Sequence, residues 1–131
     1  MNIVAESRSI TVSPRKVRLV ADSVRKLPLA KALHALTLAQ KRAARPIAKT
    51  IKSAIANAVN NNHLSEDSLK LVSVEVMEGP VMKRYHASTR GRIHPYKKQT
   101  SHIRVTLASV EKPKAVKPAQ KKAEKDESEE E

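Results

Sequence analysis

The stretch VMKRYHASTRGRIHPYKKQTSHIRV, residues Val81–Val105, decides how the second half of this 131-residue chain folds. It contains seven Lys or Arg and three His, and it contains no Asp or Glu. Alternating apolar residues border it on both sides, and Arg90-Gly91-Arg92 near its middle is the natural turn, because glycine tolerates positive φ. We therefore predict one extended β-hairpin over about residues 76–106, with its tip at Arg90-Gly91-Arg92.

The predicted hairpin is too long and too polar to lie within a compact body. Each arm spans roughly 40–60 Å at ~3.3 Å per residue, whereas a domain of about 110 residues has a radius of gyration near ~13 Å. No apolar stripe runs between Lys83 and Thr100, and a lone two-stranded ribbon is marginal in water. We expect the outer half to project and to be held by a polyanion, through phosphate contacts that need no particular base sequence.

The residues before the hairpin predict a strand followed by three helices. Apolar β-formers favour a strand over Asn2–Val12. Ser13-Pro14 and Pro28 each mark a helix start, because Ser is a good N-cap and Pro suits the first turn. A third helix is expected from about Ala44 to about Asn60, where a run of three Asn favours a turn. The apolar stripes that should face the core are Val17, Val20, Ala21, Val24 and Leu27, then Leu29, Ala32, Leu33 and Leu36, then Ile47, Ile51, Ala54, Ile55 and Ala58.

From Leu69 onward the apolar period changes to two, which predicts strands. Val72, Val74 and Val76 are expected on one face of the first of these strands, and Ile103, Val105 and Leu107 on one face of the last. The predicted fold class is therefore α+β, with three helices packed on a small antiparallel sheet and a long projecting basic hairpin. We expect residues 1–110 to form a single domain. Residues 111–131, rich in Lys, Pro and Ala and then acidic, are predicted to be a disordered tail.

The composition excludes several kinds of site. Without Cys there is no disulfide, thiolate zinc site or Cys nucleophile, and two Gly cannot build a glycine-rich phosphate loop. No apolar run approaches the ~20 residues of a membrane span, and the N-terminus lacks a signal-peptide pattern. We expect a soluble cytoplasmic protein that is not an enzyme, without a cofactor, metal, small-molecule substrate or membrane partner. The cluster His63, Glu66 and Asp67 lies in a polar turn and is not expected to be a metal or nuclease site.

The net charge of +13 indicates a polyanionic partner. Residues 1–110 hold 20 of the 26 Lys and Arg but only 6 of the 13 acids. Nucleic acid is the leading candidate. An anionic membrane surface is a weaker one, because the helices lack Trp and Phe anchors. A general DNA- or RNA-binding architectural protein that grips a minor groove with a basic ribbon is the alternative, and it predicts equal affinity for duplex DNA and folded RNA.

Five separated blocks of sequence resemble the bacterial L22 (uL22) family of large-subunit ribosomal proteins. They are SPRKVRLVAD at 13–22, KSAIANA at 52–58, EGPVMKR at 78–84, GR at 91–92 and TSHIRVTL at 100–107. The resemblance covers residues 1 to about 110. It implies a structural role in the assembly of the large subunit, with the hairpin threading through 23S rRNA. It also implies that the tip forms part of the nascent-peptide exit tunnel wall, so that neighbouring ribosomal proteins and the nascent peptide are partners.

The residues expected to contact RNA come from the first strand, the first helix start, the hairpin and the return strand. They are Arg8, Ser13, Arg15, Lys16, Arg18, Lys83, Arg84, Arg90, Arg92, Lys97, Lys98, Ser101, His102 and Arg104. For Ser13, Arg15, Lys16, Arg18, Lys83, Arg84, Arg92, Ser101 and His102 the resemblance implies this contact, by position. The resemblance implies a tunnel-lining tip at Ser88, Thr89, Arg90, Gly91 and Arg92. The family usually carries something like Pro-Arg-Ala and a basic residue before its Gly-Arg pair, where this chain reads Ala87-Ser88-Thr89-Arg90. For His102 a contact with a phosphate or 2′-OH and a solvent-facing position are equally open, and Tyr85 and Tyr96 either stack on bases or pack in the hairpin.

Overall fold

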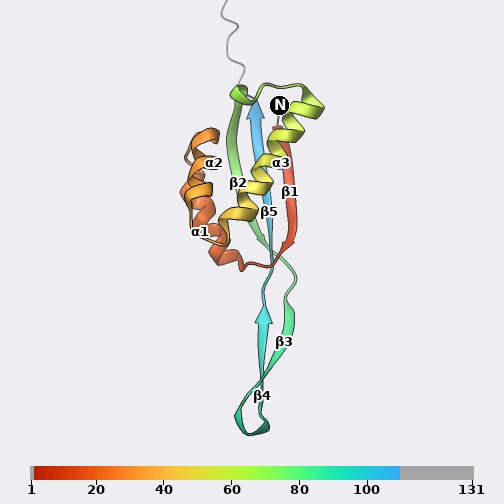
Figure 1. Ribbon diagram of the computed structural model, residues 1–131. Helices are drawn as coiled ribbons and strands as arrows, with labels where there is room; N and C mark the ends of the chain where they lie inside the picture. Colours follow the sequence, from red (N-terminus) through yellow and green to blue (C-terminus); the bar gives the residue numbers. More distant parts are fainter. Residues whose placement is uncertain (1, 110–131) are drawn as a thin grey trace, which may run out of the picture.

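Three helices cover one face of a three-stranded antiparallel sheet, and a two-stranded hairpin extends from one end of that sheet (Figure 1). The computed structural model describes residues 2–109, so the tail predicted at 111–131 lies outside the described residues. The predicted α+β fold is confirmed. The elements are β1 (Asn2–Ile10), α1 (Pro14–Val24), α2 (Leu29–Leu38), α3 (Ala44–Asn62), β2 (Leu69–Glu78), β3 (Met82–Ala87), β4 (Ile93–Lys98) and β5 (Ser101–Ser109), with short 3-10 turns at Glu66–Ser68 and Thr89–Gly91.

Strand β5 forms the centre of the sheet and supplies the middle of its inner face. It pairs antiparallel with β1 on one side and with β2 on the other. Ile103, Val105 and Leu107 are fully buried, whereas the residues between them are partly exposed. This confirms the predicted alternation, because successive strand residues point to opposite faces of a sheet.

The alternation predicted for β2 is wrong at one residue. The pairing of β2 with β5 shifts between Leu71 and Ser73, which marks a bulge at Val72. A bulge adds one residue to one strand, so the residues on either side of it no longer keep a simple period of two. Leu71 and Val74 are buried, while Val72 is 51% exposed instead of facing the core with Val74.

Helices α1 and α2 begin at the two proline-marked positions. Helix α1 starts at Pro14, and α2 starts at Leu29 with Pro28 immediately before it. Ser13 has the extended backbone of a residue that precedes a helix, but its side chain makes no capping hydrogen bond. The predicted N-cap role of Ser13 is therefore wrong for the side chain. The buried residues of the two helices are Pro14, Val17, Val20, Ala21 and Val24, then Ala32 and Leu36.

Helix α3 continues past its predicted end. It extends through Asn62, and His63 then takes the left-handed conformation with φ 52°. The backbone N–H of His63 donates to the carbonyl of Val59 at 3.1 Å, and that of Leu64 to the carbonyl of Ala58 at 3.2 Å. The Asn run thus forms the last turn of the helix, because the left-handed residue that ends it comes one position later.

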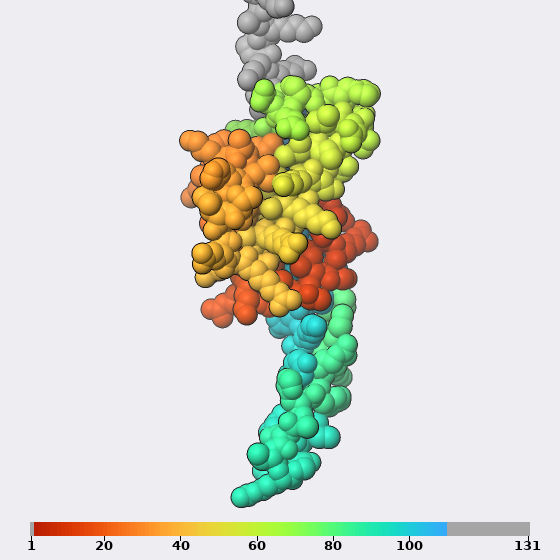
Figure 2. Space-filling model, viewed as in Figure 1, coloured from red at the N-terminus to blue at the C-terminus, as the bar shows by residue number. Residues whose placement is uncertain are grey.

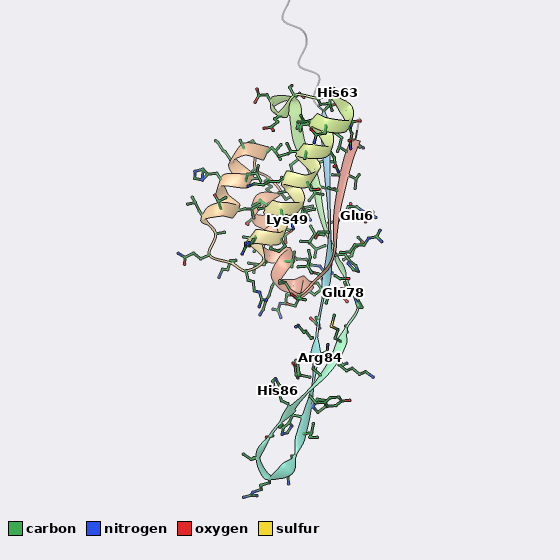
Figure 3. The ribbon with its side chains drawn as sticks, turned by 45° about the vertical axis from the view of Figure 1, so that its right-hand side comes forward. Glu6, Lys49, His63, Glu78, Arg84 and His86 are labelled. Carbon is green, nitrogen blue, oxygen red and sulfur yellow. The ribbon has the colours of Figure 1, made fainter. Side chains whose placement is uncertain are left out.

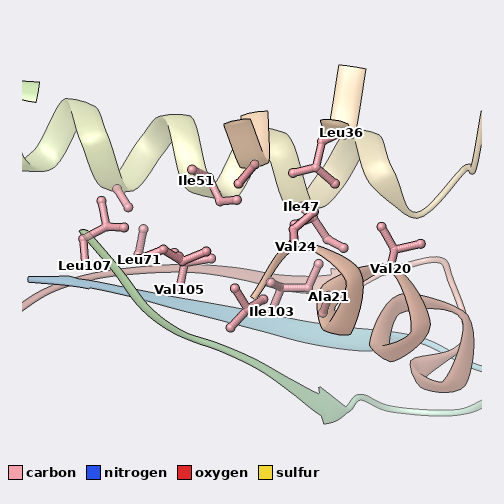
Figure 4. Packing of buried hydrophobic residues seen from close by; sticks show 14 of the residues in the cluster. Val20, Ala21, Val24, Leu36, Ile47, Ile51, Leu71, Ile103, Val105 and Leu107 are labelled. Carbon is pink, nitrogen blue, oxygen red and sulfur yellow. The ribbon is translucent and has the colours of Figure 1, made fainter. Parts of the chain in front are cut away.

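An aliphatic core fills the space between α3 and the sheet (Figure 4). Ile47 and Ile51 of α3 are fully buried, as are the inner residues of β5. The only aromatic residues of Phe, Trp or Tyr type are Tyr85 and Tyr96, and both lie in the hairpin. Every residue from Lys83 to Gln99 is exposed. The hairpin therefore receives no support from core packing.

The predicted hairpin exists, but it is not one continuous ribbon. The last pair of the sheet joins Glu78 to Ser101, and the first pair of the hairpin joins Met82 to Lys98. The residues between these pairs, 79–81 and 99–100, belong to no strand. Pro80 contributes to the break because it has no backbone N–H for a ladder hydrogen bond. Each projecting strand has 6 residues, or about 20 Å at ~3.3 Å per residue, and the space-filling view shows the hairpin standing clear of the body (Figure 2).

Candidate nucleic-acid interface

The hairpin ribbon carries cations on both of its faces. Lys83 lies directly opposite Lys97 across β3 and β4. Because strand residues alternate between faces, these two lysines share one face, while Arg84 and Lys98 lie on the other. Like charges directly opposite one another destabilise a strand pair. None of these four side chains forms an ion pair with any residue of the described region, so no carboxylate there offsets the repulsion between them.

Histidine and tyrosine rings occupy the Arg84 face of the ribbon, where Figure 3 shows Arg84 and His86. The ring of His86 stacks on Tyr96, with centroids 4.4 Å apart and an angle of 18° between the planes. Tyr85 lies on the opposite face, is 68% exposed and has no ring partner among residues 2–109. Tyr96 therefore stabilises the ribbon itself, whereas Tyr85 presents an unoccupied ring on which a nucleic-acid base can stack.

A tight turn forms the tip of the hairpin near the predicted position. The backbone N–H of Ser88 donates to the carbonyl of Arg92 at 2.8 Å, which closes the loop around Thr89–Gly91. Arg90 and Gly91 both have positive φ, 57° and 68°. A non-glycine residue is uncommon in that region of backbone space, and Gly91 makes two such residues in a row possible. All the tip side chains are exposed.

The hairpin leaves the body through a buried joint. Thr100 is only 1% exposed there, and its carbonyl accepts a hydrogen bond from the N–H of Gly79 at 2.9 Å. A Cβ atom at Gly79 would lie 2.5 Å from Oγ1 of Thr100, so a larger residue cannot fit without a shift of this joint. This hydrogen bond joins the two chain segments at the point where the hairpin leaves the body.

The arginine and lysine residues predicted at the start of α1 have different surroundings. Arg15 and Lys16 are exposed, and neither forms an ion pair within the part of the chain that is described. The guanidinium of Arg18 lies 3.4 Å from the carbonyl of Val76 and 3.6 Å from the carboxylate of Glu78. Arg15 and Lys16 are available to a polyanion, whereas Arg18 also connects α1 to β2.

Arg8 and Arg104 face an acid on the outer surface of the sheet. Arg104 donates to the Glu6 carboxylate at 2.6 Å and lies 4.0 Å from Glu75, and Arg8 donates to Glu6 at 3.0 Å. The hydrogen bond from Arg104, followed by that from Arg8, lowers the pKa of Glu6 below its usual value of 4.5. Both arginines remain partly exposed, but Glu6 already neutralises part of their charge.

The two polar residues predicted at the start of β5 occupy different environments. Ser101 is fully buried, and its hydroxyl has no hydrogen-bond partner among the described residues, so its side chain lies away from the cationic surface. His102 accepts a hydrogen bond at Nδ1 from the backbone N–H of Ser9, at 2.9 Å, where Ser9 has a φ of 54°. This bond fixes the tautomer of the neutral ring, so that Nε2 carries the proton and can donate to a phosphate.

The sequence analysis missed a second basic surface on α3 and the connection that precedes it. Residues 23–65 contain no Asp or Glu, and this absence of acids was the signal that could have revealed it. Lys49 marks this surface in Figure 3. Its cations recur at helical spacing on α3, opposite the buried residues. The exposed cations of this surface are Lys41, Arg42, Arg45, Lys49 and Lys52.

The described residues offer no metal centre and no membrane-spanning helix. Among residues 2–109, no three His, Cys, Asp or Glu side chains are placed to hold a metal ion together. His63 forms the end of α3, while Glu66 and Asp67 lie in the following 3-10 turn. None of the helices in this part of the chain is both long and apolar enough to cross a membrane.

Comparison with known proteins connects this geometry to one family. Residues 5–108 match the family model described as ribosomal protein L22p/L17e. The large ribosomal subunit protein uL22 of Mesoplasma florum is 46% identical over 99 residues, which cover 76% of this chain and 88% of that protein. The uL22 protein of Gluconobacter oxydans is 44% identical over 116 residues, covering 88% and 82%. The uL22 protein of Gluconacetobacter diazotrophicus is 44% identical over 104 residues, covering 79% and 78%.

Proposed function

The chain belongs to the ribosomal protein L22p/L17e family, and from this premise we propose how its surfaces meet rRNA. It is a structural, rRNA-binding constituent of the large subunit of the cytoplasmic ribosome, and the family is non-enzymatic. Its partners are rRNA and other ribosomal proteins. The remaining question is which parts of the fold make which contacts.

The hairpin inserts between segments of 23S rRNA and neutralises their phosphates. The observation that carries this proposal is the placement of Lys83 directly opposite Lys97 on an exposed ribbon without acids. That arrangement repels itself in water and is stabilised when phosphates surround it. Because cations project from both faces of the ribbon, RNA on both sides fits the charge distribution better than RNA on one side. The contacts are mainly to phosphates, so they position the ribbon without reading a base sequence.

The hairpin tip, Ser88–Arg92, forms part of the wall of the nascent-peptide exit tunnel. The family resemblance supports this role, and the exposed turn at Thr89–Gly91 at the far end of the ribbon is compatible with it. Arg90 and Arg92 supply positive charge there, while Ser88 and Thr89 supply neutral hydroxyl groups. Such a wall contacts a passing peptide weakly and catalyses no reaction on it.

The body binds the rRNA surface from which the hairpin projects. Arg15 and Lys16 of α1, together with the cations of α3 and its preceding connection, extend the basic surface beyond the hairpin. Arg8, Arg18 and Arg104 contribute less to RNA binding, because each already contacts a carboxylate. By bridging rRNA segments through body and hairpin together, the protein supports assembly of the large subunit.

Co-sedimentation with ribosomal particles tests this function. Tagged protein is expressed in bacterial cells, and the lysate is separated on a sucrose gradient in high salt. The proposed function predicts that the protein travels with the large subunit and its precursors, because contacts on several sides of the hairpin persist when isolated phosphate contacts are screened. Protein that stays at the top of the gradient, and binds duplex DNA and folded rRNA equally well, contradicts it and favours a general architectural nucleic-acid binder.

A further inference from the structure

A cavity of about 620 Å³ lies between the body and the base of the hairpin. Three connections and one helix line it: the link from β1 to α1, helix α1, the link from α2 to α3, and Gln99 between β4 and β5. Figure 1 shows that the starts of α1 and α3 both lie at the end of the body from which the hairpin projects. Small-ligand pockets in proteins usually measure about 300–1,000 Å³, so this one can hold a single nucleotide but not a duplex.

The lining of this cavity combines three kinds of chemistry. Its apolar part includes Val12, which is partly buried, and Leu19, which is 68% exposed. Its cations are Lys16, Lys41 and Arg42, and no Asp or Glu lines it. Its neutral hydrogen-bonding groups include the amides of Gln40 and Gln99.

The charged and amide side chains around the cavity have no bonding partner within the described part of the protein. Across residues 2–109, the side chains of Lys16, Lys41, Arg42, Gln40 and Gln99 take part in no hydrogen bond or ion pair. Five unpaired polar side chains around one apolar hollow are complementary to a ligand that is both anionic and flat. A nucleotide has a phosphate for the cations, an apolar ring face for the aliphatic side chains and polar edges for the amides.

We propose that this cavity binds one unstacked nucleotide of the rRNA, with its base against Leu19 and Val12 and its phosphate near the three cations. Protein recognition of RNA often targets bases that have left the helix stack, because their faces and edges are then accessible. The planar Arg42 guanidinium can stack on such a base, and the Gln40 and Gln99 amides can bond its edge. The bound nucleotide then touches α1, the α2–α3 connection and the hairpin base, and so locks the hairpin to the body on the RNA. This inference rests on the proposed function.

Site-specific photo-crosslinking in assembled large subunits tests the proposal. The photoreactive amino acid p-benzoylphenylalanine replaces Leu19 in one variant and Leu38 in a matched control. Leu38 on α2 is 70% exposed and lies outside the cavity. Incorporation into the large subunit is measured on a sucrose gradient before irradiation. We expect the Leu19 variant to crosslink to one or two adjacent unpaired nucleotides, which the Leu38 variant does not reach.

A second variant tests the amide contacts without changing charge. In Gln40→Ala with Gln99→Ala, the nucleotide found by crosslinking is expected to become more reactive to base-specific chemical probing. Each neutral hydrogen bond changes the equilibrium between bound and free base by a factor of roughly 2–10, so the chemical reactivity of the base should rise several-fold. Asn60→Ala with Asn61→Ala, at the opposite end of the body, should leave that reactivity unchanged.

The possible outcomes separate this inference from the function on which it rests. If the Leu19 variant enters the subunit but crosslinks to a ribosomal protein, to many paired nucleotides, or to nothing, the cavity does not hold a nucleotide and the rRNA-binding function stands. If crosslinking succeeds but the amide variant leaves reactivity unchanged, the amides do not contact the base edge and that part of the proposal is wrong. If neither variant nor the unmodified protein enters the subunit, the proposed function fails, and the cavity inference fails with it.

Discussion

The hydroxyl of Thr100 donates a hydrogen bond to the carbonyl of Pro80 at 2.7 Å, across the joint where the hairpin leaves the body. With the bond from the Gly79 N–H to the Thr100 carbonyl, it connects the two strands at the point where the regular ladder is interrupted. A ribbon without core contacts could bend at such an interruption, and these two hydrogen bonds are the contacts that hold its two segments together there.

Replacing Thr100 by Val should loosen this joint while keeping its shape. Thr100→Val removes the hydroxyl donor, so we expect the free energy of unfolding to fall by about 1 kcal/mol, measured by urea denaturation. Thr106→Val is the matched control, because Thr106 lies nearby in the chain on β5, is partly exposed and makes no side-chain hydrogen bond within the described residues. Equal stability of the two variants would show that the hydroxyl does not hold the joint.

The cations at the hairpin base should account for part of the salt dependence of rRNA binding. Lys83→Ala with Arg84→Ala removes two phosphate contacts, and each contact contributes about 0.7–0.9 to the slope of log affinity against log salt. We therefore expect the slope to become shallower by roughly 1.4–1.8. Filter binding to a 23S rRNA fragment at several salt concentrations measures it.

A charge-matched control makes that result specific to the hairpin. Lys31→Ala with Lys70→Ala removes the same charge from two exposed positions of the body. This variant should keep the slope of the unmodified protein. If both double variants change the slope alike, binding depends on total charge and the hairpin has no special role.

Deleting the tip should leave the fold intact. The residues from Thr89 to Ile93 are all exposed and contribute nothing to the core. We expect the deletion to shift the melting temperature by less than about 2 °C, whereas a loss of 1 kcal/mol shifts it by about 4–8 °C in a domain of this size. Circular dichroism measures the melt, and Ile103→Ala, which empties a core position, is the destabilised comparison.

Incorporation of the shortened protein into the large subunit is the second measurement on the tip deletion. We expect it to enter the subunit, with the chemical reactivity of rRNA changed only near the exit tunnel. Unfolding of the shortened protein would mean that the tip belongs to the folding core, contrary to its complete exposure.

The contact between Glu6 and Arg104 should make the free energy of unfolding depend on pH in the acidic range. Hydrogen bonds from Arg104 and Arg8 lower the pKa of Glu6 in the folded protein. A lowered pKa favours the folded state above the pKa of the unfolded chain, and this contribution is lost as the pH falls through the folded value. We expect the unmodified protein to lose stability as the pH falls below the usual carboxyl value of 4.5 and through the lowered pKa of Glu6. In Glu6→Gln that loss should be smaller, as urea denaturation at each pH would show. An identical pH profile for the two proteins would contradict the effect.

Much of this fold follows from local patterns in the sequence. Pro14 and Pro28 mark the starts of α1 and α2, because proline is tolerated where the N–H has no helical partner. The period of two over Ile103, Val105 and Leu107 identifies the central strand. The excess of cations indicates a polyanionic partner. These features are predictable because each depends on the backbone chemistry or charge of a few neighbouring residues.

The features that the sequence did not predict depend on contacts between segments far apart in the chain. The bulge at Val72 is invisible in a run of apolar residues, because only the partner strand shows which one is extra. The burial of Ser101 and the acceptor role of His102 depend on the position of β1. The cavity that Leu19 helps to line combines side chains from four parts of the chain. No local pattern contains that information.

The measurement that tests the central claim most directly is a cryo-electron-microscopy map of the large subunit that contains this protein. The account predicts that residues 82–98 are enclosed by 23S rRNA, with Lys83 and Lys97 near phosphates on one face of the ribbon and Arg84 and Lys98 near phosphates on the other. It also predicts that the turn at Thr89–Gly91 faces the exit tunnel. A map in which the body is bound but the hairpin extends into solvent, without rRNA around it, would contradict the account.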